Sequence, residues 1–171
     1  MAKERKITMF LRQLKAEDAP LMLQWMHDES VVANLGTNFA EKTLADCQRF
    51  IASSLSDEEN LHLAVADETD EYMGTVSLKH IDRARKTAEF AITVRAAAMG
   101  RGYSRFGMER ILEKGIRELG LETIWWCVSP ANCRAVRFYD KRGYQRTEQV
   151  PAHILAPYPS DMELLWYVYT G

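Results

Sequence analysis

Hydrophobic positions along the chain follow two periods, and the switch between them predicts the order of the elements. Runs of six to nine residues that alternate or are continuously apolar predict strands. They lie at Ile7–Leu14, Leu61–Ala66, Met73–Leu78, Ala88–Ala96, Glu122–Val128, Tyr144–Gln149 and Glu163–Tyr169. Apolar residues repeating every three to four positions predict helices at Glu17–Met26, Lys42–Leu55, Tyr103–Leu119 and Pro130–Arg142. The predicted order is β-α-α-β-β-β-α-β-α-β-β.

Two of these segments carry most of the information about the fold. Tyr103–Leu119 is the clearest amphipathic helix, and Gly120 follows it as a stop signal. Ala88–Ala96 is apolar at both odd and even positions except at Glu89, which is typical of a central strand covered on both faces. We therefore expect an α+β fold in which a mixed, mostly antiparallel twisted sheet is flanked by helices, as one domain over residues 1–171.

Composition narrows the class of protein. Of the 171 residues, 47% are apolar and 27% charged, an ordinary globular balance, and the net charge of −2 argues against a basic nucleic-acid-binding face. The amino terminus shows no signal peptide and no apolar stretch is long enough to span a bilayer, so we expect a cytoplasmic protein without a membrane partner. The three cysteines (Cys47, Cys127, Cys133) are an odd number without a Cys-x-x-Cys spacing, so we expect reduced, partly buried thiols. The histidines are scattered along the chain, so we expect no metal site.

The segment from Val94 to Ser104 is a candidate anion-binding loop. A buried strand runs into Gly100 and Gly102, which open directly into the amphipathic helix. The first turn of a helix has unpaired N–H groups, and glycines let a phosphate approach them closely, so a diphosphate is the natural ligand. A dinucleotide motif would need a third glycine where Arg105 stands, and the Gly-Lys-Ser/Thr of an NTPase loop is absent. A plain strand-to-helix turn is the alternative.

A second candidate group lies on the next helix. Asn132 and Tyr139 are seven residues apart, so they would share one helix face about 10 Å apart along the axis, the scale of a pantetheine arm. An amide could hold such an arm while a phenol lies near its sulfur. In the alternative interpretation Asn132 caps the helix and Tyr139 packs in the core.

Together these residues resemble the GNAT family of N-acetyltransferases, and within it the RimJ/RimL-type and polyamine or amino-sugar branch. The phosphate-loop pattern of that family falls on Met99, Gly102 and Ser104, with Met99 in place of the usual Arg or Gln and Ser104 in place of a small Gly or Ala. A second pattern falls on Asn132, Ala135, Phe138, Tyr139, Gly143 and Tyr144. The opening motif at residues 11–14 and the Trp-x-x-Asp at residues 25–28 also match, so the resemblance covers nearly the whole chain.

The resemblance implies an acetyl-CoA-dependent N-acetyltransferase acting by direct attack of a primary amine, which would be a small amine, an amino sugar or a protein N-terminus. It assigns acetyl-CoA binding to Val94, Ala96, Met99, Gly100, Arg101, Gly102, Tyr103, Ser104, Asn132 and Arg134. It assigns protonation of the leaving CoA thiolate to Tyr139, and stabilisation of the oxyanion to a backbone N–H near Val94–Ala96. It also allows a homodimer.

Candidates for the base and for the acceptor contacts complete the site. An alkyl amine is mostly protonated at pH 7, so some group must remove a proton before attack. The resemblance points to Glu89, which lies on the strand before the loop and ten residues before Met99, where some members of the family carry a catalytic glutamate. Pairing of Glu89 with Arg85 or Lys86 at the strand entry is the alternative. Trp25, Asp28 and Glu29 are candidates for binding the ammonium group, unless they are a packed Trp and a solvated acidic turn.

Two functions from other classes compete with this interpretation. The first is a catalytically silent acyl-CoA-binding or regulatory module of the same fold, which the substitution at Met99 favours and the presence of Tyr139 and Glu89 disfavours. The second is a nucleic-acid-binding module, which is disfavoured because the basic residues are interspersed with acids.

Overall fold

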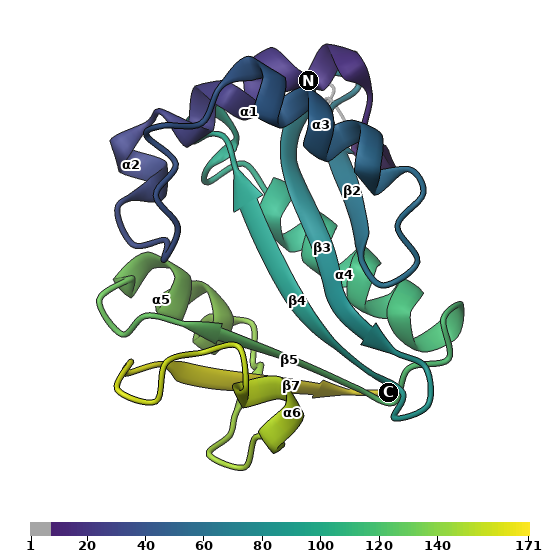
Figure 1. Cartoon of the computed structure of the whole chain (residues 1–171), viewed down its shortest axis with the longest axis vertical. Coiled ribbons are helices and arrows are strands. Elements are labelled where there is room, and N and C mark those ends of the chain that lie inside the picture. The colour runs from purple at the N-terminus through teal and green to yellow at the C-terminus, as the bar shows by residue number, and fades with distance from the viewer. Residues whose placement is uncertain (1–7) are drawn as a thin grey trace, which may run out of the picture.

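The computed structural model describes residues 8–171 and contains one sheet with helices on both of its faces (Figure 1). The strands are β1 Phe10–Gln13, β2 Leu61–Ala66, β3 Tyr72–Asp82, β4 Thr87–Val94, β5 Thr123–Val128, β6 Gln145–Arg146 and β7 Leu165–Thr170. The helices are α1 Ala19–Met26, α2 Glu29–Val32, α3 Leu44–Ser54, α4 Tyr103–Arg117, α5 Cys133–Lys141 and α6 Ala152–Leu155, with 3₁₀ turns η1 at Ala16–Asp18 and η2 at Ala96–Ala98.

The sheet has seven strands in the order β1-β2-β3-β4-β5-β7-β6. Five of the six neighbouring pairs are antiparallel, and β4 and β5 form the parallel pair. A parallel pair needs a crossover connection, and α4 provides it. The mixed, mostly antiparallel α+β sheet expected from the sequence is therefore confirmed.

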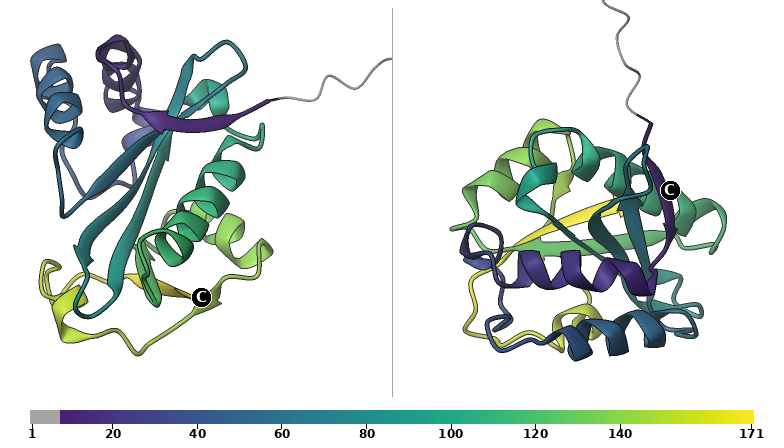
Figure 2. Two further views of the ribbon diagram at one scale, coloured as in Figure 1. Left: turned by 90° about the vertical axis from the view of Figure 1, so that its right-hand side faces the viewer. Right: turned by 90° about the horizontal axis from the view of Figure 1, so that it is seen from above.

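Helices cover the sheet on two sides, and each side has its own hydrophobic core (Figure 2). On one face α1 and α3 pack over β2 and β3 through Met22, Trp25, Cys47 and Ile51. On the opposite face α4 and α5 pack against the centre of the sheet, and Trp126 is the largest fully buried side chain there. The alternation of side chains along each strand thus divides the apolar residues between two layers.

Close packing fixes the position of α4 on the sheet. A Cβ at Gly107 would lie 2.7 Å from Cγ2 of Val65 and 2.9 Å from Cγ1 of Val76, so only glycine lets the helix axis approach these strands so closely. At the far end of the helix, a Cβ at Gly115 would lie 2.9 Å from Cδ1 of Leu78. The absence of a side chain at these two glycines therefore lets α4 lie close against β2 and β3.

Several predicted boundaries were wrong, each for a local reason. The first strand begins at Phe10; Ile7 lies outside the described residues. The helix predicted from Pro130 begins at Cys133, because Asn132 serves as its N-cap. The strand predicted at Tyr144–Gln149 is only Gln145–Arg146, and the four-residue helices α2 and α6 were not predicted because one turn shows no period.

The cysteines are free thiols in the described part of the chain, but their burial differs. Cys47 is buried and Cys127 partly buried, whereas Cys133 is exposed in the first turn of α5. The expectation of three partly buried thiols was therefore wrong for Cys133, whose side chain lies on the solvent face of a helix with a strongly one-sided apolar stripe.

Candidate active site

Strands β4 and β5 separate in the middle of the sheet. They pair only at Thr87↔Thr123, Ala88↔Ile124 and Glu89↔Trp125. Beyond that point β4 stays paired with β3 as far as Val94, and β5 stays paired with β7 as far as Val128 (Figure 1). Within residues 8–171 the facing edges of the two strands therefore have backbone N–H and C=O groups that no ladder pair uses, and these can bind an extended ligand that contains amides.

The glycine loop lies where β4 ends. Backbone φ is +74° at Gly100 and +88° at Gly102, values that a side chain strongly disfavours. Gly102 is the N-cap of the 15-residue helix α4 and has no side chain with which to satisfy the first N–H groups of the helix. The amino end of α4 therefore presents free N–H donors and a positive dipole end to solvent, which is the local structure that an anion requires.

Two arginines lie at this loop, Arg101 within the loop itself and Arg134 on the helix α5. Arg101 is exposed beside the ring of Tyr103, and its guanidinium carbon lies 5.4 Å from the ring centroid. Arg134, in the first turn of α5, places its guanidinium against the sulfur of Met99. Tyr103 itself is fully buried, and its hydroxyl has no hydrogen-bond partner among the described residues. Arg101 and Arg134 thus bring positive charge to the loop and to the start of α5.

The remaining residues predicted to bind the cofactor lie around the same corner. Val94 is buried at the end of β4, Ala96 is exposed in η2, and Ser104 is partly buried at the second position of α4. Asn132 accepts a hydrogen bond from the backbone N–H of Ala135 at 3.2 Å, so it caps α5 as in the alternative weighed from the sequence. This bond uses the side-chain oxygen and leaves the amide nitrogen as a donor.

Tyr139 lies under the sheet in an aromatic cluster. Its residue is 6% exposed, and its ring centroid lies 5.6 Å from that of Trp126 and 5.0 Å from that of Tyr167. Burial raises the pKa of the Tyr139 phenol well above its ordinary value, and the charges of neighbouring Tyr167 and Cys127 act in the same direction. The phenol therefore stays protonated at neutral pH, as a proton donor must.

Glu89 occupies the last β4 position paired with β5, on the face opposite Tyr139. It is 2% exposed, and one carboxylate oxygen accepts a short hydrogen bond from the hydroxyl of Tyr158. The other oxygen lies 3.8 Å from Nε2 of His80. Arg85 pairs with Asp82 and Lys86 with Glu122, so the strand-entry ion pair considered from the sequence is not formed.

Tyr158 is a site residue that sequence reasoning missed. It comes from the irregular segment after α6, 69 positions from Glu89, and its hydroxyl lies beside both Glu89 and the thiol of Cys127. Burial and the bond to the carboxylate raise the pKa of the Tyr158 phenol. The one available signal was the Pro-containing loop that joins the last two strands, which carries a single tyrosine.

A cavity of about 300 Å³ lies between the sheet and the helices α1 and α3. Trp25 lines it, and so do Ala91 and Thr93 of β4, which follow Glu89 in the region where β5 has separated. Asp28 and Glu29 do not line it: Asp28 caps α2 through the N–H of Ser30, and Glu29 is exposed. Of the three residues predicted to bind the acceptor, the structure brings only Trp25 to this cavity.

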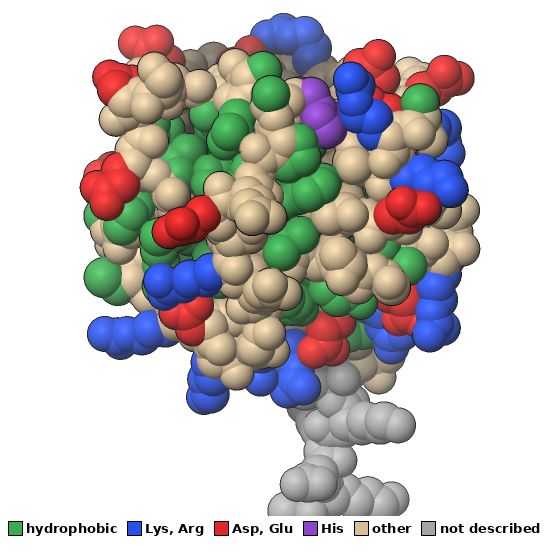
Figure 3. All heavy atoms as spheres, turned by 90° about the horizontal axis from the view of Figure 1, so that it is seen from below, with side chains coloured by type: hydrophobic (Ala, Val, Ile, Leu, Met, Phe, Trp, Pro, Cys, Tyr) green, Lys and Arg blue, Asp and Glu red, His purple; other side chains and the backbone are tan. Residues whose placement is uncertain are grey.

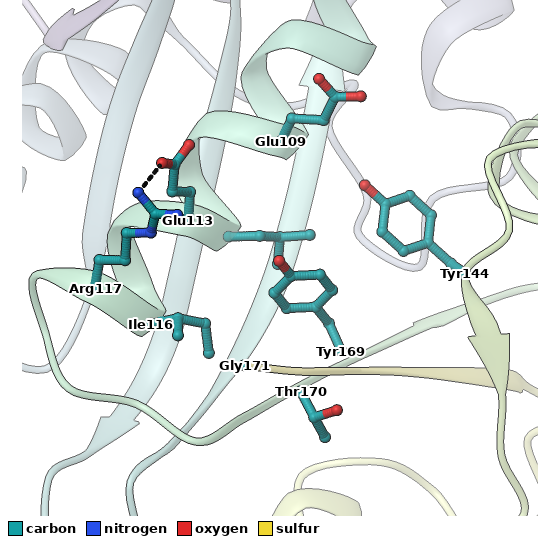
Figure 4. A pocket seen from close by; sticks show the side chains of 9 residues that line it. Glu109, Glu113, Ile116, Arg117, Tyr144, Tyr169, Thr170 and Gly171 are labelled. Atoms are coloured by element: carbon teal, nitrogen blue, oxygen red, sulfur yellow. Dashed lines mark ion pairs between the residues drawn. The ribbon is translucent and has the colours of Figure 1, made fainter.

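A larger cavity, of about 550 Å³, lies away from the separated strands (Figure 4). It is lined by Glu109 and Glu113 of α4 together with Tyr144, Tyr169 and the C-terminal Gly171. Both carboxylates are paired, Glu109 with Arg105 and Glu113 with Arg117. This larger cavity contacts neither the glycine loop nor Tyr139, so its size does not make it the active site. We place the active site at the separation of β4 and β5.

The described surface carries charges of both signs. On the face seen from below, Lys and Arg side chains are interspersed with Asp and Glu side chains around an apolar area (Figure 3). In residues 8–171 no group of three or more His, Cys, Asp or Glu side chains is arranged to hold a metal ion. None of the helices in this range combines the length and apolarity needed to cross a bilayer.

Comparisons with known proteins identify relatives of the whole domain. Residues 8–145 match the family model described as an acetyltransferase (GNAT) domain. An uncharacterized N-acetyltransferase p20 from Bacillus licheniformis is 26% identical over 139 residues, covering 80% of this chain and 78% of that protein. Spermidine N(1)-acetyltransferase from Vibrio cholerae is 24% identical over 137 residues, covering 78% and 77%.

A solved structure shares the fold over almost the full length. The crystal structure of spermidine N-acetyltransferase from Vibrio cholerae in complex with CoA and spermine superposes with a TM-score of 0.78 and 18% identity. The match covers 95% of each chain. At this identity the likeness concerns the overall architecture of the domain.

Proposed function

The chain belongs to the GNAT acetyltransferase family and is an acyltransferase enzyme, and we propose that it transfers the acetyl group of acetyl-CoA to the nitrogen of a primary amine. The observation that carries the proposal is the separation of β4 from β5 directly before the uncapped amino end of α4. This arrangement offers unpaired strand edges to the amides of pantetheine and helix N–H groups to its diphosphate in one continuous path.

The cofactor would be held mainly by backbone. The N–H groups of Gly100, Gly102 and the first turn of α4 would bind the diphosphate oxygens, while Arg101 and Arg134 supply positive charge at the rim. The edge of β4 near Val94 would pair with the pantetheine amides. Met99 supplies no charge of its own, but its contact with Arg134 brings a guanidinium to the position where the family resemblance expects Arg or Gln.

In the reaction the amine nitrogen attacks the thioester carbon, the C–S bond breaks, and the CoA thiolate takes up a proton. Tyr139 would donate that proton, which its burial keeps on the phenol at neutral pH. A backbone N–H near Val94–Ala96 would stabilise the oxyanion. No bond forms between the acetyl group and the enzyme.

Glu89 would accept the proton that the ammonium loses, directly or through a water molecule. It is the buried carboxylate at the separation of the two strands, and Tyr158 holds it in place through a hydrogen bond. Because Tyr158 lies on a loop that covers this end of the sheet, it also excludes solvent from Glu89. We propose it as a positioning residue.

The proposal is tested by binding and by turnover. Isothermal titration calorimetry should show binding of acetyl-CoA and of CoA, and a thiol reagent should detect CoA release when spermidine, amino sugars, simple amines or N-terminal peptides are added. Binding without release from any amine would support the silent acyl-CoA-binding module instead. Failure to bind either nucleotide at millimolar concentration would contradict both functions.

Two glycines at opposite ends of α4 provide a matched pair of variants. Gly102 and Gly120 both have positive φ, +88° and +70°, so replacement by alanine strains the backbone similarly at each. Only Gly102 lies at the proposed diphosphate site. We expect Gly102→Ala to weaken CoA binding about tenfold or more through a displaced backbone and a Cβ at the phosphate, whereas Gly120→Ala should bind CoA as the unmodified protein does.

A further inference from the structure

The cavity between the sheet and the helices α1 and α3 carries information about the class of amine. Its walls are apolar and aromatic, formed by Met22, Trp25, Met26, Phe39 and Phe50. Trp25 and Phe39 stand edge to face with ring centroids 5.2 Å apart. Such walls favour a ligand whose body is apolar, because the apolar groups of the ligand are removed from water when they enter the cavity.

Several of the polar side chains along the walls are hydrogen-bonded to a neighbouring polar group. Nδ1 of His62 lies 2.6 Å from the hydroxyl of Ser77, and the indole N–H of Trp25 donates to Tyr72, whose hydroxyl lies 2.6 Å from that of Thr75. Burial lowers the pKa of His62, so its imidazole is neutral at pH 7. Among the described residues that line the cavity, Asp46 is the one carboxylate, and it is partly exposed rather than deep in the wall.

The mouth of the cavity is electrically balanced. Lys42 and Asp46 are the charged residues that line it. The carboxylate of Asp46 accepts hydrogen bonds from the backbone and the side chain of Thr43 and pairs with Arg49. A polyamine bound here would have one amine at the reaction centre and further ammonium groups in a largely apolar cavity. The one described carboxylate that lines it, Asp46, is already paired with Arg49, so this arrangement is unfavourable.

Building on the proposed function, we propose that the acceptor is a primary monoamine with an apolar body, such as an arylalkylamine, and that a polyamine is a poor acceptor. The body lies among Trp25, Phe39 and Phe50, and the amine points along Ala91 and Thr93 towards the separated strands. The acceptor is thereby recognised by its carbon skeleton, in contrast to the spermidine after which the Vibrio cholerae relative is named.

Steady-state acetylation of a small panel tests this inference. We expect kcat/KM for 2-phenylethylamine to exceed that for ethylamine and for spermidine by about a hundredfold, since each apolar group accommodated in such a pocket adds severalfold or more. Equal or better use of spermidine would overturn the inference and leave the proposed acetyltransferase function intact. A preference for N-terminal peptides over 2-phenylethylamine would also overturn it. Release of CoA from none of the amines would defeat the proposed function, and the inference with it.

Variants in the wall of the cavity and at its mouth test separately how the shape and the charge of the cavity contribute to the choice of amine. Phe39→Ala should raise KM for 2-phenylethylamine about tenfold, leaving the affinity for CoA unchanged, because Phe39 lies on the loop before α3 and away from the glycine loop. Lys42→Glu should improve kcat/KM for spermidine severalfold by making the mouth acidic. Arg83→Glu makes the same change in net charge at the exposed β3–β4 turn and should have no such effect. An unchanged KM in Phe39→Ala would contradict the placement of the acceptor body.

Discussion

Replacing Tyr139 by phenylalanine removes one hydroxyl from the centre of the proposed mechanism and keeps the ring. The ring contacts with Trp126 and Tyr167 remain available to phenylalanine. Among the described residues no group hydrogen-bonds to the Tyr139 hydroxyl, so its removal leaves no partner unsatisfied. We therefore expect a change in unfolding free energy of less than about 1 kcal/mol, which is a few degrees or less in melting temperature for a chain of this size.

The expected effect on catalysis is much larger. General acid catalysis contributes about 10²- to 10⁴-fold in rate. We expect a factor at the lower end of this range, because a thiol with a pKa of about 8.5 can already leave as the unprotonated thiolate. Loss of the Tyr139 proton should thus reduce kcat roughly a hundredfold, or about 2.7 kcal/mol of transition-state stabilisation. The affinity for acetyl-CoA should change little.

Single-turnover and steady-state acetylation, together with calorimetry of CoA binding, measure these quantities separately. Tyr144→Phe is the control, because Tyr144 contacts the same Trp126 ring at 5.3 Å and is only partly buried. Its kcat should stay within about twofold of the unmodified enzyme. A kcat for Tyr139→Phe equal to that of the control would refute the role of the phenol as acid. A loss of CoA affinity without a loss of kcat would instead assign Tyr139 to packing of the cofactor site.

Two further predictions concern Glu89 and Tyr72. Glu89→Gln should lower kcat/KM about a hundredfold and leave the affinity for CoA unchanged, because the variant cannot accept the proton of the amine; an unchanged kcat/KM would clear Glu89 of the role of base. Burial raises the pKa of Tyr72 to about 12, so the folded state holds this proton more tightly than the unfolded state with its ordinary value of 10.0. This contribution of Tyr72 is fully present below pH 10, is lost as pH rises from 10 to 12, and amounts to about 2.7 kcal/mol in all. Between pH 9 and pH 11.5, urea unfolding should show a loss of stability about 2 kcal/mol smaller for Tyr72→Phe than for the unmodified protein, because the other buried tyrosines contribute equally in both.

Local sequence was sufficient for the parts of the site whose geometry is set by neighbouring residues. The strand Leu61–Ala66 was predicted with the observed bounds, and α4 was predicted from its first residue, because each follows from periodicity within a few turns or pleats. Gly100 and Gly102 were assigned to a tight loop before a helix, and both have positive φ. Such features depend on backbone sterics over a short span, so the sequence alone determines them.

Tertiary structure decided which distant residues meet. The hydrogen bond from Tyr158 to Glu89 joins residues 69 positions apart, and the cavity combines α1, α3 and three strands. Neither follows from periodicity, because the pairing of strands and the docking of a loop depend on the free energy of the packed whole. The same holds for Asp28, whose carboxylate the sequence left available for a substrate and the fold uses to cap α2. Sequence determined the longer elements and the glycine loop, while packing decided where β4 leaves β5 and therefore where a ligand can enter.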